Sequence, residues 1–303
     1  MADPSAAPRR IGGLPIALAA YTLWGVMPLY LTQLNAVHPV ALLGWRILWT
    51  IPICLFASTL TGRLGEVRAA LANRRLLGML TLSALAITIN WFTYILAVHY
   101  GEFYAASLGY FIGPLVNIAI GTVILKERLT RLQWIAVALA TVAVAVLAAD
   151  ALFTLYISLA LALTFSVYGL IRKQIAVEAL PGLTVETTLL ALPSVLMIAF
   201  APVSAMQFGD SLASSALLMG AGVMTASPLL LFSIAVRRMT YSAMAFCQFL
   251  APALVLIEGL VIFKQPLLPS QAVCFALIFV GIMLFCFDIL KRQRQVPKPV
   301  PMD

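Results

Sequence analysis

Charged residues are scarce in this sequence. They make up 10% of its 303 residues, whereas 63% are hydrophobic and the mean hydropathy is +1.04. Soluble domains carry roughly 25% charged and 45–50% apolar residues, so the composition excludes an ordinary soluble protein and indicates a chain embedded in a lipid bilayer. The net charge of +8 does not indicate nucleic-acid binding, because the basic residues are scattered between apolar runs without an aromatic–basic patch.

Residues for metal, redox or hydrolytic chemistry are also few. The two histidines, His38 and His99, have no ligand-like neighbours in the sequence, and the four cysteines lie in apolar runs without a CxxC spacing. P-loop, GxSxG and HExxH motifs are missing. We therefore expect no enzyme activity, no cofactor, no metal site and no ATP-driven step in this chain.

Long apolar runs fill the sequence instead. A helix that spans a membrane needs about 20 apolar residues, and lipid offers no partner for an unpaired backbone. The sequence therefore predicts an all-α integral membrane protein with about ten transmembrane helices and short connections. The predicted spans lie near 14–34, 39–60, 75–98, 103–124, 131–149, 151–171, 184–203, 213–236, 242–263 and 270–290.

Lysine and arginine predict the orientation of these spans, because cytoplasmic loops carry an excess of both. With the N-terminus inside, 17 of the 19 basic residues lie on the cytoplasmic side. The exceptions are Lys264, on the opposite side, and Arg46, within a span. We expect both termini to be cytoplasmic, with an N-terminal tail over 1–13 and a basic, proline-rich, disordered tail over 291–303.

The chain also repeats itself, since Pro252 minus Pro114 is 138 and the same offset recurs at three further identical pairs. These pairs are Lys126 and Lys264, Gly121 and Gly259, and Gln133 and Gln271. The offset covers five predicted helices, an odd number, so the two copies run in opposite directions through the membrane. The sequence predicts two inverted five-helix repeats, 14–149 and 151–290, an architecture typical of secondary transporters with a site where the halves meet. A static bundle built by duplication is the alternative.

Polar residues share one face of the predicted helix near 103–124. Ser107, Tyr110, Pro114 and Asn117 step by 3, 4 and 3 residues, and the repeat copy places Gln248 and Pro252 on the matching face. A proline frees a backbone carbonyl and permits a bend, so we expect Pro114 and Pro252 to act as gating hinges. Helix packing is the alternative interpretation of this face.

Further polar and aromatic side chains lie deep in other predicted spans, where they either line a cavity or satisfy each other in a packed bundle. The candidate substrate-binding residues are Trp24, Arg46, Asn90, Trp91, Tyr94, Ser107, Tyr110, Asn117, Tyr168 and Gln248. Arg46 could bind an anionic substrate group; snorkelling to the headgroups and a structural ion pair remain alternatives. For Glu258 we favour a structural partner, and for Glu102 a first-turn interaction with the helix dipole.

Several of these stretches resemble the RarD branch of the EamA-like drug/metabolite transporter superfamily. They are "ASLGYFIGPLVNI" (106–118), "KERLTRLQWIAV" (126–137), "VYGLIRKQIAVEAL" (167–180), "AAYTLWG" in the first helix and "NW" in the third. The resemblance covers nearly the whole chain. It implies a ten-helix carrier of the bacterial inner membrane with a central cavity, and related carriers export amino acids, other metabolites or drugs. Where the branch is expected to carry a carboxylate, this chain has Ala105, so a proton-coupling role at that position is in doubt.

Two functions are compatible with these residues. The first is a secondary transporter that exports a small amphipathic, amino-acid-like metabolite or a drug by alternating access, with coupling to protons left open. The second is a non-transporting membrane sensor or scaffold, in which the buried polar groups satisfy each other. The sequence assigns neither the substrate nor the oligomeric state.

Overall fold

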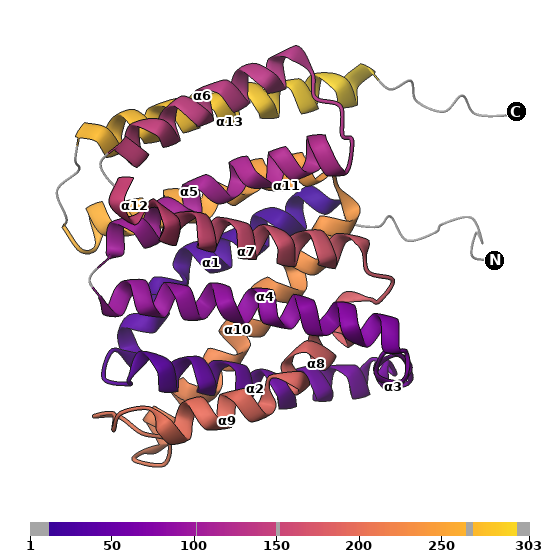
Figure 1. Cartoon of the computed structure of the whole chain (residues 1–303), viewed down its shortest axis with the longest axis vertical. Helices are drawn as coiled ribbons and strands as arrows, with labels where there is room; N and C mark the ends of the chain where they lie inside the picture. Colours follow the sequence, from indigo (N-terminus) through magenta and orange to yellow (C-terminus); the bar gives the residue numbers. More distant parts are fainter. Residues whose placement is uncertain (1–11, 101, 150–151, 265–268, 296–303) are drawn as a thin grey trace, which may run out of the picture.

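The computed structural model describes residues 12–100, 102–149, 152–264 and 269–295, and within these ranges every regular element is a helix. Thirteen α-helices and three short η segments follow each other along the chain (Figure 1). They are α1 (Gly13–Leu31), η1 (Thr32–Leu34), α2 (Pro39–Leu60), α3 (Leu64–Ala72), α4 (Arg74–His99), α5 (Phe103–Ala119), η2 (Ile120–Ile124), α6 (Arg131–Ala149), η3 (Leu152–Thr154), α7 (Leu155–Gln174), α8 (Ala179–Leu189), α9 (Ala191–Phe200), α10 (Leu212–Arg238), α11 (Tyr241–Gln248), α12 (Leu250–Val261) and α13 (Pro269–Gln295).

The all-α membrane fold predicted from composition is confirmed. In the described part of the chain, nine helical stretches are long and apolar enough to cross a bilayer, and the bent pair of α8 and α9 makes a tenth. The span predicted near 184–203 corresponds to this pair, which begins at Ala179, ends at Phe200 and bends by 45° between α8 and α9. Pro193 explains the break, since its ring clashes with the carbonyl of Leu189 and it has no N–H to donate.

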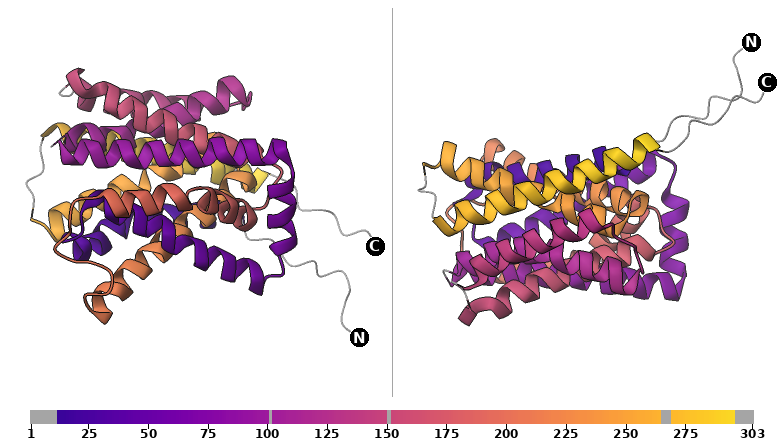
Figure 2. Two further views of the ribbon diagram at one scale, coloured as in Figure 1. Left: turned by 60° about the horizontal axis from the view of Figure 1, so that its bottom comes forward. Right: turned by 90° about the horizontal axis from the view of Figure 1, so that it is seen from above.

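One end of the helix bundle collects the basic residues. The beginning of α1 and the end of α13 lie on the same side of the bundle in Figure 1, and Arg46 and Lys264 are the described basic residues away from that side. We call this side the basic end and the other the opposite end. Helix α3, which was not predicted, runs across the long helices at the basic end (Figure 2).

Helices from the two halves of the chain pair in matching ways. Helix α5 contacts α7, and α12 contacts α1, which is the same pairing once the predicted repeats are exchanged. The exchange also relates α4–α7 to α10–α1, and it maps the contact of α6 with α13 onto itself. Two inverted copies of one five-helix unit produce this pattern. We therefore propose that the repeat boundaries drawn from the sequence, 14–149 and 151–290, divide the structure as well.

The repeat is visible in one backbone turn that occurs at both ends of the molecule. Lys126 and Lys264 are the described non-glycine residues with positive φ, at 55° and 53°. Just before them, the Leu125 N–H donates to the Ile120 carbonyl at 3.0 Å, and the Phe263 N–H donates to the Glu258 carbonyl at 3.1 Å. Both bonds span five residues and lie 138 residues apart. The two copies therefore share a helix ending that the sequence alone did not reveal.

Glycine at either turn should stabilise the protein. A left-handed conformation costs an L-residue about 1–2 kcal/mol, and glycine adopts it without that cost. We expect Lys126→Gly and Lys264→Gly each to raise the free energy of unfolding by about 1 kcal/mol, measured by unfolding in detergent micelles. Arg128→Gly is the matched control, because Arg128 does not have positive φ. An equal gain in that variant would contradict the explanation.

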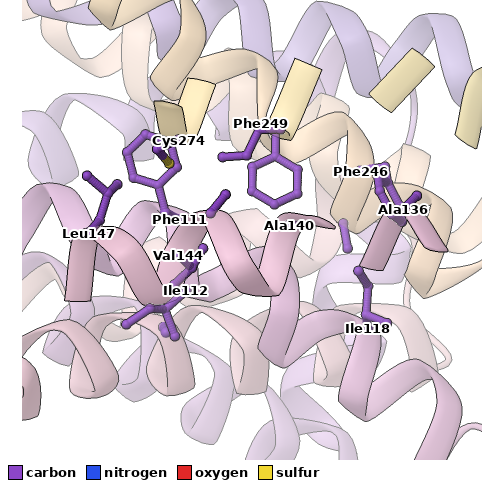
Figure 3. Packing of buried hydrophobic residues seen from close by; sticks show 14 of the residues in the cluster. Phe111, Ile112, Ile118, Ala136, Ala140, Val144, Leu147, Phe246, Phe249 and Cys274 are labelled. Carbon is purple, nitrogen blue, oxygen red and sulfur yellow. The ribbon is translucent and has the colours of Figure 1, made fainter. Parts of the chain in front are cut away.

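The outermost helices form a separate apolar layer. Helix α6 lies antiparallel to α13 along one edge of the bundle (Figure 1), and both cover α5 and α11. Figure 3 shows the packing, in which Phe246 of α11 lies beside Ala136 of α6, Phe249 beside Ala140, and the ring of Phe111 of α5 beside Cys274 of α13. The buried cluster of this layer is apolar, although Asp288 near the end of α13 is also buried.

Candidate functional site

Arg46 lies where four membrane helices converge. It belongs to the half of α2 nearer the opposite end, and its Nε donates to Thr225 Oγ1 of α10 at 3.0 Å. Its Nη2 lies 3.4 Å from Met27 Sδ of α1, and its guanidinium carbon lies 5.8 Å from the centre of the Trp91 ring of α4. No ion pair in the described part of the chain includes Arg46. A structural ion pair, one of the alternatives for Arg46, is therefore not found in the described part of the chain.

Two tyrosines complete the surroundings of this arginine. The rings of Tyr94 of α4 and Tyr110 of α5 meet edge to face with centroids 5.9 Å apart, and both side chains lie close enough to interact electrostatically with Arg46. Tyr94 is 37% exposed and Tyr110 47% exposed, and Ser107 is exposed one turn away. We name this group the Arg46 site. It consists of Arg46, Trp91, Tyr94, Ser107, Tyr110 and Thr225.

An exposed polar group of this kind does not suit a surface covered by lipid. Ionisable residues within spans almost always face the interior of the bundle or water, and hydroxyl groups lose their hydrogen bonds in hydrocarbon. The Arg46 site combines a guanidinium, two phenols and aromatic faces. Chemically, it can hold an anionic group by charge-assisted hydrogen bonds and an apolar or aromatic group by ring contacts.

Asn90 lies one turn before Tyr94, but its side-chain amide is already hydrogen-bonded to α7. Its Nδ2 donates to the Leu161 carbonyl at 2.7 Å and to Thr164 Oγ1 at 3.0 Å, both on α7. The side chain thus ties α4 to α7 beside the Arg46 site. Thr164 was not singled out from the sequence, because one threonine in an apolar run carries no signal of its own.

Asn117 and Gln248 are brought together, at a distance from the exposed face. Asn117 Nδ2 donates to Gln248 Oε1 at 2.7 Å, and the two residues are 1% and 6% exposed. This bond joins α5 to α11, the matching helices of the two repeats, near Gly113, where a Cβ would lie only 2.9 Å from Gln248 Nε2. The face analysis therefore grouped residues that the structure separates. Ser107 and Tyr110 belong to the Arg46 site, whereas Asn117 and Gln248 contact each other.

The two prolines keep different surroundings. Pro114 is buried within α5, and Pro252 lies in α12 just after the helix breaks at Phe249. Pro252 has no N–H to offer the Gln248 carbonyl four residues earlier, which explains the break between α11 and α12. Their assignment as gating hinges stays a prediction.

Trp24 and Tyr168 lie in an aromatic cluster between α1, α7 and α10. The Tyr168 ring stacks on Phe232 of α10 at 5.8 Å, and Trp24 meets Phe165 edge to face at 5.6 Å. Tyr21, Tyr168 and Phe232 are at most 1% exposed. We name Tyr21, Trp24, Phe165, Tyr168 and Phe232 the aromatic plug. It closes the space between α1, α7 and α10, so Trp24 and Tyr168 are not part of the exposed Arg46 site.

Polar contacts reinforce this closure between α7 and the helices that follow. Tyr241 Oη of α11 donates to the Ser166 carbonyl at 2.6 Å. Lys173 Nζ donates to the carbonyls of Val236 and Met239 at 3.0 and 2.7 Å. At the opposite end, Ser158 Oγ of α7 donates to the Ala105 carbonyl of α5 and Tyr30 Oη of α1 to the Leu217 carbonyl of α10, both at 2.6 Å, and the His38 N–H donates to Ser204 Oγ at 2.8 Å. The contacts of Tyr241 and Lys173 thus join α7 to α10 and α11 at the basic end.

Glu127 seals the same end by a route that the sequence did not suggest. Its carboxylate accepts hydrogen bonds from the backbone N–H groups of Tyr241 and Ser242 at 2.6 and 2.9 Å and from Ser242 Oγ at 2.7 Å. It thereby caps the first turn of α11, where a negative charge is favourable.

Replacing Glu127 with glutamine should destabilise the closed end. A glutamine offers one acceptor oxygen and turns an N–H donor toward donors of α11, and hydrogen bonds to charged groups contribute about 1.5–3 kcal/mol. We expect Glu127→Gln to lower the free energy of unfolding by about 2 kcal/mol. Glu66→Gln, which removes an exposed carboxylate 3.9 Å from Arg63, is the control and should change it by less than about 0.5 kcal/mol. Equal effects of Glu127→Gln and Glu66→Gln on unfolding curves in detergent would show that Glu127 does not cap α11.

A buried ion pair is the second polar feature that the sequence did not indicate. Arg172 Nη1 of α7 lies 3.3 Å from Glu186 Oε1 of α8, and the two side chains are 0% and 2% exposed. The sequence placed Arg172 on the cytoplasmic side but did not predict that its side chain is buried. Gly182 makes room for it, because a Cβ there would overlap the guanidinium. An acidic residue within the predicted span was the available signal, and it was overlooked.

Comparison with known proteins agrees with this architecture. The model of the EamA-like transporter family matches residues 11–149. An uncharacterised transporter of Pseudomonas aeruginosa is 39% identical over 95% of this chain and 97% of its own length, and Protein RarD of Escherichia coli is 35% identical over 94% and 97%. A crystal structure superposes with a TM-score of 0.70 at 20% identity, covering 90% of this chain and 96% of that one, and thus shares the fold. The chain is therefore a multi-pass membrane protein of the EamA-like transporter family and belongs to its RarD branch.

Proposed function

We propose that this protein is a secondary transporter that exports a small amphipathic molecule, either an amino-acid-like metabolite or a drug, by alternating access. The observation that carries the proposal is the contrast between the two ends of the bundle. The Arg46 site is exposed in the half toward the opposite end, whereas the aromatic plug and the Glu127 cap close the basic end. An alternating-access carrier has this form when it is open to one side.

The basic end is taken as cytoplasmic, because short loops rich in lysine and arginine stay inside. Both termini then lie in the cytoplasm of a bacterium, and the described conformation faces away from it across the inner membrane. Inverted repeats allow the reverse arrangement, since each contact at one end has a related position at the other. The transport cycle would exchange these two arrangements around the Arg46 site.

The residues of the Arg46 site favour an amphipathic substrate. The guanidinium suits a carboxylate or another anionic group. The rings of Trp91, Tyr94 and Tyr110 suit an apolar or aromatic portion of the same molecule. The family resemblance extends to carriers of amino acids, other metabolites and drugs, and the site chemistry is compatible with each of them.

A non-transporting sensor or scaffold is the second candidate, and two contacts favour it. Asn117 is bonded to Gln248, and Asn90 to α7, as expected if buried polar groups exist only to satisfy each other. The exposed tyrosines and the arginine without an acidic partner in the described chain are what this hypothesis does not explain.

Transport into inverted membrane vesicles tests the proposal. The panel would contain labelled amino acids and planar drugs, and accumulation would be measured with the chain present, absent or replaced by Tyr110→Phe. Tyr156→Phe is the matched control, because Tyr156 is an exposed tyrosine at the start of α7, away from the Arg46 site. We expect accumulation that Tyr110→Phe reduces and Tyr156→Phe does not.

Collapsing the proton gradient in the same vesicles would separate coupled export from facilitated diffusion. Accumulation above the external concentration that disappears with the gradient would indicate proton coupling. Absence of chain-dependent flux for every compound, together with a folded protein, would count against transport and in favour of the sensor or scaffold.

A further inference from the structure

The most buried carboxylate of the described spans is that of Glu186. Arg172 is its partner on α7, and Arg172 is held by two further bonds. Its Nε donates to Ser233 Oγ of α10 at 3.1 Å, and its Nη2 donates to the Ala179 carbonyl at 3.0 Å. The pair thus joins α7, α8 and α10 in the half that the aromatic plug closes. A buried pair of this kind is weak support for stability as such, because desolvation offsets the attraction.

One oxygen of this carboxylate is left without a partner. Glu186 Oε1 faces Arg172, but Oε2 has no hydrogen bond, and neither has Ser83 Oγ of α4, which lies near enough to interact with the carboxylate. A buried carboxylate oxygen normally accepts hydrogen bonds. When the group is protonated, the hydroxyl becomes a donor, and Ser83 Oγ is the available acceptor on its open side.

Glu186 is the carboxylate of this cluster, and the other groups that face it are hydroxyls, a thiol and the guanidinium of Arg172. Tyr168 of α7 and Cys54 of α2 lie within electrostatic reach of it, and α4 and α10 contribute the hydroxyls of Ser83 and Ser233. Helix α3 packs on α8 at its beginning, where Arg63 lies 3.9 Å from Glu178. The described α9 carries no ionisable side chain.

We propose that Glu186 is a proton-binding site and that its protonation releases the closed basic end. The ionised pair has no net charge. A proton on Oε2 leaves Arg172 as a buried positive charge without its counter-ion, which a closed, apolar cluster tolerates poorly. Opening toward the cytoplasm returns water to the guanidinium. Deprotonation there restores the pair, and the pair stabilises the conformation that is closed at the basic end.

This inference rests on the proposed function and gives it a direction. Protonation of the pair favours the inward-facing conformation, and release of the proton to the cytoplasm restores the pair and permits the return with substrate bound. Proton entry and substrate exit are then two halves of one cycle. Ala105, which stands where the family resemblance led us to expect a carboxylate, does not exclude coupling, because Glu186 supplies one on a different helix.

Native cysteines provide the first test without introduced reporters. Cys54 is fully buried in the same apolar cluster as Tyr168, whereas Cys274 is fully buried in the α6–α13 layer. The full chain in lipid nanodiscs would be treated with a small thiosulfonate at neutral pH, and modification of each cysteine would be followed by mass spectrometry. We expect Glu186→Gln, which mimics the protonated acid, to raise the Cys54 rate about tenfold or more and to leave Cys274 unchanged.

The matched control is Glu258→Gln, since Glu258 is also a buried carboxylate, on α12, with neither oxygen hydrogen-bonded. It should leave the Cys54 rate as in the unmodified chain. An unchanged Cys54 rate in Glu186→Gln would overturn the proposal. A parallel rise at Cys54 and Cys274 would overturn it as well, because the pair would then only hold the fold together.

Infrared difference spectra between neutral and mildly acidic buffer test proton binding itself. Acidification should produce the carbonyl bands of buried protonated carboxylic acids in the unmodified chain, and one of these bands should be lost in Glu186→Gln but kept in Glu258→Gln. No such band in the unmodified chain would sink the proposal. Neither measurement needs a substrate, so failed transport would defeat the proposed function alone. Flux whose dependence on the proton gradient survives Glu186→Gln would defeat this inference alone.

Discussion

Replacing Arg172 with methionine lowers the free energy of unfolding by about 3–5 kcal/mol, the largest stability effect that we expect from one substitution in a span. The change leaves Glu186 as a buried carboxylate without its counter-ion, at 2% exposure. Glu186→Leu should cost a similar amount for the converse reason. The double variant, with both charges removed, should lie within about 1–2 kcal/mol of the unmodified chain, because a buried ion pair can be replaced by apolar residues at little cost.

Unfolding by titration of a denaturing detergent into mild micelles measures these differences. Arg63→Met is the matched control, since Arg63 also lies near carboxylates, at 3.9 Å from Glu66 and Glu178, but is 39% exposed. Its loss should change the stability by less than about 1 kcal/mol. A double variant that is as unstable as the sum of the single ones would show that the two residues act independently.

Replacing Arg46 with glutamine weakens the apparent affinity for carboxylate-bearing substrates by about 100-fold. Removing one member of a desolvated charge pair costs about 2–5 kcal/mol, and each 1.4 kcal/mol is a factor of ten. Glutamine can keep a hydrogen bond to Thr225 and lacks only the charge. The concentration dependence of uptake into inverted vesicles measures the change for the compounds that the transport panel identifies.

Two comparisons make this result specific. Thr225→Val removes the hydroxyl that accepts the bond from Arg46 Nε and should weaken affinity by about tenfold or less. Neutral amides of the same substrates should be nearly insensitive to Arg46→Gln. Equal losses for the acids and their amides would mean that Arg46 supports the fold of the site rather than binding an anion.

The general architecture could be predicted from the sequence, because the signals for it are long and redundant. The span count follows from apolar runs of 20 residues, and the inverted repeat from identities at a constant offset. The bend at Leu190 was missed, since Pro193 lies where a proline can also sit in the first turn of a helix. Only the packing of α8 and α9 against α2 decides whether the segment stays one helix or bends at Leu190.

The candidate site was predictable in part, for a different reason. Arg46, Tyr94 and Tyr110 stand out because ionisable and phenolic groups are rare in spans, and the structure brings them together. Trp24 and Tyr168 look equally promising in the sequence, but which face of an apolar helix meets a neighbour is decided by tertiary packing. The burial of Arg172 was not predicted, because a basic residue two positions from a helix end resembles a surface anchor.

The charge of Arg46 has an electrical consequence for the transport cycle. Reorientation of an empty carrier moves this charge relative to the membrane field, and a full elementary charge gains about 2.3 kcal/mol per 100 mV. A negative interior therefore favours the empty carrier with Arg46 open to the cytoplasm. An anionic substrate cancels the charge of Arg46. The membrane potential therefore has little effect on the outward reorientation of the loaded carrier. The membrane potential would thus accelerate the return of the empty carrier and give export a direction independent of any bound ion.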